Sequence, residues 1–222
     1  DMDLLLQNGG NSYDWLLRAY DGAADGEPRN TGRAYFNRDS GTGIGKFLED
    51  WLPSYKATRK DGLYCLITCN HDTIRPAANL TADELKLAYA MLFTMPGAPF
   101  LYYGDEIGMR YRKLPTKEGG YYRTGSRTPM QWAPGENLGF SDAAPEALYL
   151  PVDPSPDAPT VAAQQADPGS LWHTVQSLLS FRHAHRDLDA DAPFKVLFAP
   201  KAQGDFRPFA WRRGSLVCAV NP

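Results

Sequence analysis

Several features that mark particular classes of protein are missing from this sequence. No apolar run approaches the roughly 18–20 residues that a helix needs to cross a bilayer. With 23 basic and 26 acidic residues, the net charge of −3 gives no reason to expect nucleic acid or a membrane surface as partner. The chain opens with Asp1-Met2-Asp3 and shows no cleavable apolar leader, so we expect it to start inside a longer protein.

Cysteine is also scarce, with three residues in the 222. Cys65 and Cys69 lie in an apolar run, and Cys218 lies near the end of the sequence. An odd count without a C-x-x-C pair argues against a disulfide framework and against a zinc site. This usage favours a reducing compartment, and we expect a cytoplasmic location.

Three common catalytic motifs are absent: the G-x-S-x-G elbow, the glycine-rich phosphate loop and H-E-x-x-H. What remains is a composition of 43% hydrophobic and 22% charged residues, which is ordinary for a globular domain. Aromatic residues make up 12%. They suit a cleft in which sugar rings stack, although large cores use the same side chains.

The first 60 residues give only weak structural signals. Residues 2–6 indicate a short strand or the start of a helix, and residues 12–20 carry apolar side chains at helical spacing. A surface loop is expected over residues 21–40. A helix is expected over residues 45–52, ended by Pro53.

The pattern becomes sharper between residues 62 and 104. The apolar run at 63–69 predicts a strand that is covered on both faces. Thr81 and Glu84 form a capping box before a helix that ends at residues 95–97. A second strand over residues 98–103 completes a strand–helix–strand unit, which is typical of α/β folds.

The remainder is loop, helix and short strands. Residues 110–165 are dense in glycine and proline and predict a long loop of the kind that is usually functional. Asp167-Pro168 predicts the start of another helix. Apolar runs at 194–198, 206–211 and 216–220 predict an antiparallel sheet.

The strongest local signal is the segment from Asn70 to Arg75, directly after the first strand. Polar groups at the carboxyl ends of parallel barrel strands are where barrel enzymes hold their sites. Asp72 can accept two sugar hydroxyls, His71 can donate to a third, and Arg75 can hold the carboxylate charged or reach the sugar. An ordinary turn explains these residues equally well, because Asn and Asp favour turns.

Two further segments are candidates. Asp105 and Glu106 follow the second strand and could act as general acids or metal ligands, but an acidic pair at a helix start is the commoner explanation. In the long loop, Gln131 and Trp132 of the Arg127–Trp132 segment could line a sugar cleft. They could equally anchor the loop, and their spacing does not decide between the two.

Taken together and in this order, these motifs resemble the α-amylase superfamily of glycoside hydrolases, retaining enzymes built on a (β/α)8 barrel. Residues 70–72 resemble the motif after barrel strand seven, and residues 95–108 resemble helix seven running into strand eight. Residues 127–132 resemble a loop of the α-glucosidase and trehalose-synthase-like branch. The resemblance covers most of residues 60–220, while residues 1–60 fit strand and helix six only loosely.

The resemblance implies an α/β fold in two parts. Residues 1–188 would hold about strands six to eight of the barrel. Residues 189–222 would begin a C-terminal antiparallel β-sandwich. The substrate implied is an α-glucosidic bond of a short oligosaccharide, cleaved or transferred through a carboxylate nucleophile and an acid/base about 5–5.5 Å apart.

The resemblance also implies roles for individual residues. Asp72 matches the family carboxylate that grips the hydroxyls of the sugar being cleaved and stabilises the transition state, and His71 matches its partner. Asn70 and Arg75 would flank these two, and Glu106 would support the cleft after strand eight. No cofactor or metal ligand is implied in this segment; the family allows a calcium ion, whose ligands would usually lie elsewhere.

The family nucleophile and acid/base follow strands four and five, and neither motif occurs in this sequence. We therefore expect a fragment that is inactive alone. A closed barrel leaves no free strand edge, so this piece should need the missing half of the barrel or another chain. Two alternatives stay open: a non-catalytic carbohydrate-binding or scaffold protein, and an interaction module without a role in carbohydrate chemistry.

Overall fold

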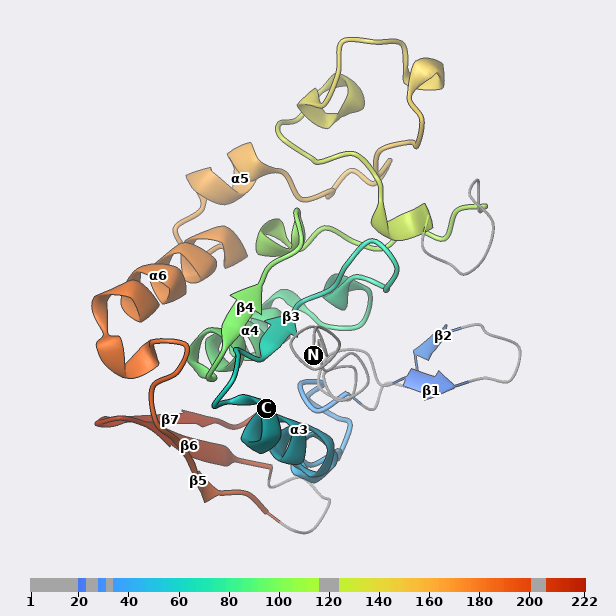
Figure 1. Cartoon of the computed structure of the whole chain (residues 1–222). Coiled ribbons are helices and arrows are strands. Elements are labelled where there is room, and N and C mark those ends of the chain that lie inside the picture. Colours follow the sequence, from blue (N-terminus) through green and yellow to red (C-terminus); the bar gives the residue numbers. More distant parts are fainter. Residues whose placement is uncertain (1–19, 23–27, 31–33, 116–123, 201–206) are drawn as a thin grey trace.

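The computed structural model describes residues 20–22, 28–30, 34–115, 124–200 and 207–222 (Figure 1). Its strands are β1 (Tyr20–Gly22), β2 (Pro28–Asn30), β3 (Cys65–Ile67), β4 (Ala98–Phe100), β5 (Phe194–Phe198), β6 (Phe209–Arg213) and β7 (Leu216–Val220). Its α-helices are α3 (Gly45–Thr58), α4 (Ala82–Thr94), α5 (Val161–Ala166) and α6 (Leu171–Ala184). Short 3-10 turns are η1 (Pro76–Ala78), η2 (Asp105–Ile107), η3 (Thr124–Ser126), η4 (Glu136–Gly139), η5 (Pro145–Ala147) and η6 (Arg186–Leu188). None of the described helices is long and apolar enough to span a membrane.

The strand–helix–strand unit predicted from the sequence is confirmed. β3 and β4 pair in parallel, with Cys65 opposite Ala98 and Ile67 opposite Phe100. Figure 1 shows the two strands side by side, next to α4. Both strands are shorter than predicted, and Phe100 is 55% exposed. In β3, for which cover on both faces was predicted, Leu66 is buried while Cys65 and Ile67 are half-buried, so among the described residues one face is covered fully and the other in part.

Helix α4 begins and ends where the sequence predicts. The Thr81 hydroxyl accepts from the backbone N–H of Glu84, and the Glu84 carboxylate accepts from the backbone N–H of Thr81 at 2.8 Å. This reciprocal pair satisfies donors that the first turn of a helix leaves unpaired. The apolar face, with Leu85, Ala88 and Leu92, is buried. Capping and burial together fix this helix between the two strands.

Helix α3 continues past Pro53, and the predicted end of this helix is wrong. Pro53 lies inside the helix on its exposed side, and the helix runs on to Thr58. The rings of Trp51 and Tyr55 stack 4.8 Å apart, and both are buried. Because the turn after Pro53 carries Tyr55 into the core, burial of that ring offsets the backbone hydrogen bond that proline cannot make.

Helix α6 begins three residues later than predicted. Its N-cap is Ser170, whose hydroxyl accepts from the backbone N–H of His173 at 3.3 Å. Asp167 instead follows α5, and its carboxylate accepts from the backbone N–H of Gly169 at 2.9 Å. The Asp-Pro-Gly segment is thus a turn between two helices. Aspartate favours such turns as readily as caps, so the sequence alone did not distinguish them.

The predicted surface loop over residues 21–40 is wrong for residues 34–36, and it also contains the antiparallel pair of β1 and β2. Ala34, Tyr35 and Phe36 are fully buried. The Tyr35 hydroxyl donates to the carbonyl of Arg207 at 2.7 Å, and the Arg207 guanidinium donates to the carbonyl of Tyr35 at 2.9 Å. A partner so distant in sequence leaves no local signal. The strand or helix expected over residues 2–6 lies outside the described residues, and so does the helical spacing predicted over residues 12–20 except for Tyr20, which belongs to β1.

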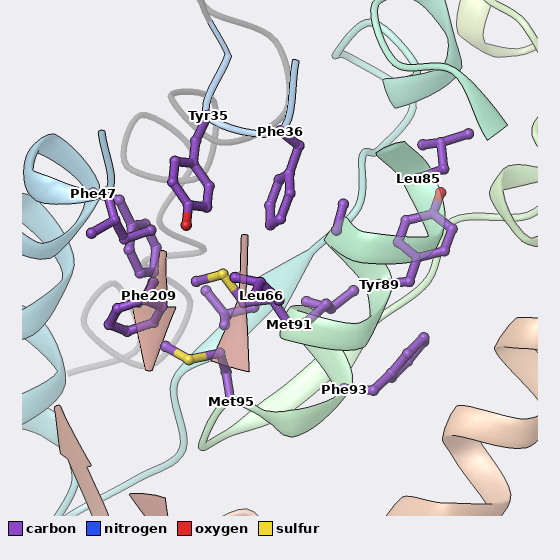
Figure 2. Packing of buried hydrophobic residues seen from close by; sticks show 14 of the residues in the cluster. Tyr35, Phe36, Phe47, Leu66, Leu85, Tyr89, Met91, Phe93, Met95 and Phe209 are labelled. Atoms are coloured by element: carbon purple, nitrogen blue, oxygen red, sulfur yellow. The ribbon is translucent and has the colours of Figure 1, made fainter. Parts of the chain in front are cut away.

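The predicted antiparallel sheet is present, in the order β5-β6-β7. β5 and β7 have the predicted bounds, while β6 begins at Phe209. Val196 lies opposite Trp211, and Trp211 lies opposite Cys218. Figure 2 shows side chains from the segment before α3, from α3, from α4 and from the sheet converging on one core. That single cluster includes Phe36, Trp51, Met91, Phe209 and Trp211, so the sheet and the βαβ unit share their buried surface.

Candidate active site

A tight turn after β3 presents Asp72 and His71 to solvent. The backbone N–H of Asp72 donates to the Asn70 Oδ1 at 2.8 Å, and the backbone N–H of Asn70 donates to the Thr73 hydroxyl at 3.0 Å. These bonds are the kind that Asn makes in turns. Asn70, predicted to contact the substrate, therefore uses its side-chain oxygen to shape the turn that carries Asp72.

The Asp72 carboxylate contacts His71 and Arg127. Its Oδ2 lies 3.1 Å from His71 Nε2, and its Oδ1 accepts from Arg127 Nη2 at 2.9 Å. Arg127 Nε also donates to the carbonyl of His71 at 2.9 Å. The Asp72 side chain is 44% exposed. Because the carboxylate is partly open to solvent, hydroxyl groups of a polyol can reach it.

Arg75 does not line the candidate site, although the sequence suggested that it would flank the sugar. Its side chain is fully buried and forms an ion pair with Asp105 at 2.8 Å. It also donates to the carbonyls of Tyr103 at 2.6 Å and Ser126 at 3.0 Å. The guanidinium carbon lies 4.9 Å from the ring centre of Tyr102 and 4.8 Å from that of Tyr103. Arg75 therefore binds the protein itself, because none of its side chain is exposed to a ligand.

The adjacent carboxylates Asp105 and Glu106 have separate environments. Asp105 is buried, and it accepts from the Thr68 hydroxyl at 2.5 Å and from the Cys69 thiol at 3.1 Å. Burial raises the pKa of Asp105, while the neighbouring Arg75 opposes that shift. Glu106 is only half-buried, and there too burial raises the carboxyl pKa. Asp105 is thus a structural group, whereas Glu106 faces an open pocket.

The pocket that contains Glu106 has a volume of about 540 Å³. Its aromatic lining comes from Tyr103, Trp132, Phe140 and Tyr149. The last three are 50%, 48% and 60% exposed, which is unusual for large apolar side chains. Glu106 and Arg127 are the charged residues among its lining. Because Arg127 also bonds to Asp72, the pocket adjoins the Asp72 turn.

The sequence reasoning missed Arg127, which joins Asp72 to the pocket. It considered the Arg127–Trp132 segment only for Gln131 and Trp132. Trp132 does line the pocket, but Gln131 is buried and its amide donates to the carbonyl of Pro159, so it anchors the loop. Asp72 and Arg127 are 55 positions apart, and no periodic pattern in the sequence connects residues at that distance.

The described residues hold no group of three or more His, Cys, Asp and Glu side chains placed to bind a metal ion. Residues able to bind a ligand by hydrogen bonds are instead gathered in the Asp72–His71–Arg127 cluster and in the adjoining pocket. The arrangement suits a neutral polyhydroxylated ligand, because carboxylate and guanidinium groups are paired next to exposed aromatic rings.

Residues 44–191 match the model of the α-amylase catalytic domain. The trehalose synthase/amylase TreS of Mycobacterium tuberculosis is 33% identical over 164 residues, covering 67% of this chain and 25% of that protein. An α-glucosidase of Pediococcus pentosaceus is 29% identical over 195 residues, covering 71% of this chain and 34% of that protein. The chain therefore spans about a quarter to a third of these relatives.

Solved structures show the same fold. The trehalulose synthase MutB from Pseudomonas mesoacidophila MX-45 superposes with a TM-score of 0.66 at 20% identity, over 81% of this chain and 38% of that one. A MutB double mutant in complex with isomaltulose gives a TM-score of 0.67 over the same shares. At this level of identity the likeness speaks for the fold alone.

Proposed function

The chain belongs to the α-amylase catalytic-domain family, a family of (β/α)8 barrels, and from that premise we propose that it forms part of an enzyme acting on α-glucosidic bonds of short oligosaccharides. The observation that carries the proposal is the Asp72 turn after β3, where an exposed carboxylate is held by His71 and Arg127. The α-glucosidase and trehalose synthase relatives support the substrate class.

In this proposal β3 and β4 are strands seven and eight of the barrel. Their parallel pairing through α4, with the candidate site at the carboxyl ends of both strands, supports this assignment. The β5-β6-β7 sheet is then the beginning of a C-terminal β-sandwich. The division is that proposed from sequence, with barrel residues at 1–188 and sandwich residues at 189–222.

Within the site, Asp72 binds hydroxyls of the glucose ring next to the bond that reacts. His71 and Arg127 orient the carboxylate, and its exposed part accepts from hydroxyls of the ligand. His71 is 61% exposed and supplies a further polar contact to the same ring. Such bonds favour the transition state when they strengthen as the ring distorts.

Nucleophile and acid/base are supplied, in this proposal, by other residues of the complete barrel. Asp105 is unsuited to either role because it is buried and paired with Arg75. Among the strands that the structure describes, β3 and β4 pair only with each other, and such a pair needs further strands beside it, since unpaired edges bind other chains. The 222-residue chain should therefore bind an α-glucoside without turning it over.

The test measures binding of methyl α-D-glucoside to the 222-residue chain by ligand-observed NMR titration. Asp72→Asn keeps the shape of the side chain and removes its charge. We expect the affinity of this variant to fall about tenfold, the loss that follows from about 1.4 kcal/mol of a charge-assisted hydrogen bond. Asp142→Asn, at an exposed aspartate of the long loop, is the matched control and should bind as the wild type does.

Equal affinity of Asp72→Asn and wild type would refute the role of Asp72. Turnover of p-nitrophenyl α-glucoside by the chain alone would refute the proposal that the reacting carboxylates lie elsewhere. Absence of glucoside binding by the wild type would instead favour a scaffold or interaction module.

A further inference from the structure

We infer that Ser126 is a positioning residue for the Asp72 carboxylate, because it fastens the turn that carries Asp72 to the segment that supplies Arg127. The inference rests on the proposed function, in which this carboxylate binds the ligand. Ser126 is fully buried and therefore touches no ligand itself. It acts through the turn to which it is bonded.

Residues 126 and 127 bond to three consecutive residues of the Asp72 turn. Arg127 donates from Nε to the carbonyl of His71 and from Nη2 to Asp72 Oδ1, each at 2.9 Å. The Ser126 hydroxyl donates to the carbonyl of Thr73. Two neighbouring side chains of one segment thus hold three neighbouring residues of the other.

Among these three bonds, the one from Ser126 has the most buried donor. The side chain of Asp72 is 44% exposed and that of Arg127 is 22% exposed, whereas Ser126 is 0% exposed. A partly exposed ion pair is weak, since water competes for both groups and the long arginine side chain loses rotamer freedom. A hydrogen bond in a less polar environment is stronger. The geometry of the exposed pair therefore depends on the buried bond beside it.

The carbonyl that Ser126 holds belongs to the residue that closes the turn. The backbone N–H of Thr73 donates to the carbonyl of Asn70 at 3.3 Å, and the Thr73 hydroxyl accepts from the backbone N–H of Asn70 at 3.0 Å. Asp72 lies between these two residues in the chain. A displacement of Thr73 therefore displaces Asp72 as well.

Ser126 is itself fixed by the buried ion pair beneath the site. Its carbonyl accepts from Arg75 Nη2 at 3.0 Å, and Arg75 pairs with Asp105 at 2.8 Å. The hydroxyl of Ser126 thus points to the turn from a residue whose backbone is already held.

The neighbouring Gly125 limits the position of η3 further. A Cβ atom at Gly125 would lie 1.7 Å from the carbonyl oxygen of Arg112, so only glycine allows this close approach. The backbone N–H of Arg112 also donates to the carbonyl of Gly125 at 3.2 Å. Because η3 is held on this side too, the bond from Ser126 to Thr73 sets where the Asp72 turn lies.

The experiment uses Ser126→Ala, which removes the hydroxyl without adding volume. In NMR spectra of the 222-residue chain, the Arg127 Nε–H resonance is assigned by its loss in Arg127→Lys. In Ser126→Ala this resonance should shift toward the position of solvent-exposed arginines. Affinity for methyl α-D-glucoside should fall about fivefold, the factor that corresponds to one net hydrogen bond.

Ser170→Ala is the matched control, because Ser170 is also buried and its hydroxyl also donates to a backbone carbonyl, that of Gln164, at 2.7 Å. Both alanine variants should melt at a lower temperature than the wild type. Only Ser126→Ala should move the Arg127 resonance and weaken glucoside binding. Added to Asp72→Asn, Ser126→Ala should weaken binding less than twofold further, since both changes act on the same carboxylate.

An Arg127 resonance that is unchanged in Ser126→Ala would overturn the positioning role. The same conclusion would follow if Ser170→Ala moved the resonance as far, or if Ser126→Ala lost its full fivefold also in the Asp72→Asn background. The resonance is read without sugar. Failure of the wild type to bind the glucoside would therefore refute the proposed function, while the resonance still decides whether Ser126 positions Arg127 and the turn.

Discussion

Two arginines from motifs near the candidate site differ in burial and in their contact with Asp72. Arg75 lies three residues after Asp72 in sequence, yet it is buried and paired with Asp105. Arg127 lies far away in sequence, yet it bonds to Asp72 and keeps 22% of its side chain exposed. The two are connected, because Arg75 holds the carbonyl of Ser126, the residue before Arg127. Arg75 thus positions the residue that touches Asp72.

The buried pair predicts a large effect of Arg75 on stability. Arg75→Met leaves the Asp105 charge buried without its cation, so the free energy of unfolding should fall by about 3–5 kcal/mol in denaturant titrations. Arg75→Met combined with Asp105→Asn should recover a large part of that loss, because the amide carries no charge.

Arg186→Met is the control for this experiment, since Arg186 is exposed, and it should change the unfolding free energy by less than about 0.5 kcal/mol. A drop for Arg75→Met no larger than that of Arg186→Met would contradict the structural role of the pair.

At the scale of elements, helix α4 is fixed at both ends. Its N-terminus carries the Thr81–Glu84 capping box. At its C-terminus Arg182 donates to the carbonyls of Phe93 at 2.7 Å and Met95 at 3.1 Å, and Arg213 donates to that of Thr94 at 2.9 Å. Burial lowers the pKa of Arg213 to about 10. Carbonyls that a helix end leaves unpaired are thereby satisfied by side chains from α6 and β6.

Loss of the capping box should weaken α4 measurably. Thr81→Ala removes the acceptor for the Glu84 N–H, and we expect about 1 kcal/mol less stability against denaturant. Thr81→Ser keeps the hydroxyl and is the matched control, with a smaller change. Equal stability of the alanine and serine variants would show that the box contributes nothing.

At the scale of the molecule, one hydrophobic core crosses the boundary proposed between residues 188 and 189. Phe209, Trp211 and Val220 of the sheet belong to the same buried cluster as Trp51 of α3 and Met91 of α4. Figure 2 shows Phe209 in the same cluster of buried side chains as Phe47 and Met95. The parts on either side of the boundary therefore depend on each other for burial.

Shared burial predicts cooperative unfolding. Helix content by circular dichroism and tertiary packing by tryptophan fluorescence should give one coincident thermal transition. Trp211→Ala should lower the stability of the whole chain by about 3–5 kcal/mol, because it opens a large cavity at the shared interface. Val217→Ala, at a strand residue that is 68% exposed, is the control. Two separate transitions in the wild type would refute a common core.

Much of the fold was predictable because its signals are local. The capping box at Thr81, the strand–helix–strand order and the strands at 194–198 and 216–220 depend on neighbours within a few residues. Element ends were less predictable where distant contacts decide them. Pro53 did not stop α3 because Tyr55 packs in the core, and Tyr35 is buried because Arg207 reaches it.

The sequence by itself determined the family motifs, the turn that carries Asp72 and the helices whose caps and apolar faces lie within one segment. Only the tertiary structure decided which polar groups face a ligand. It buried Arg75 against Asp105 and brought Arg127 to Asp72. Local bonds follow from residue type and spacing, whereas the partner of a long charged side chain depends on where the chain returns after tens of residues. The candidate site depends on such long-range contacts.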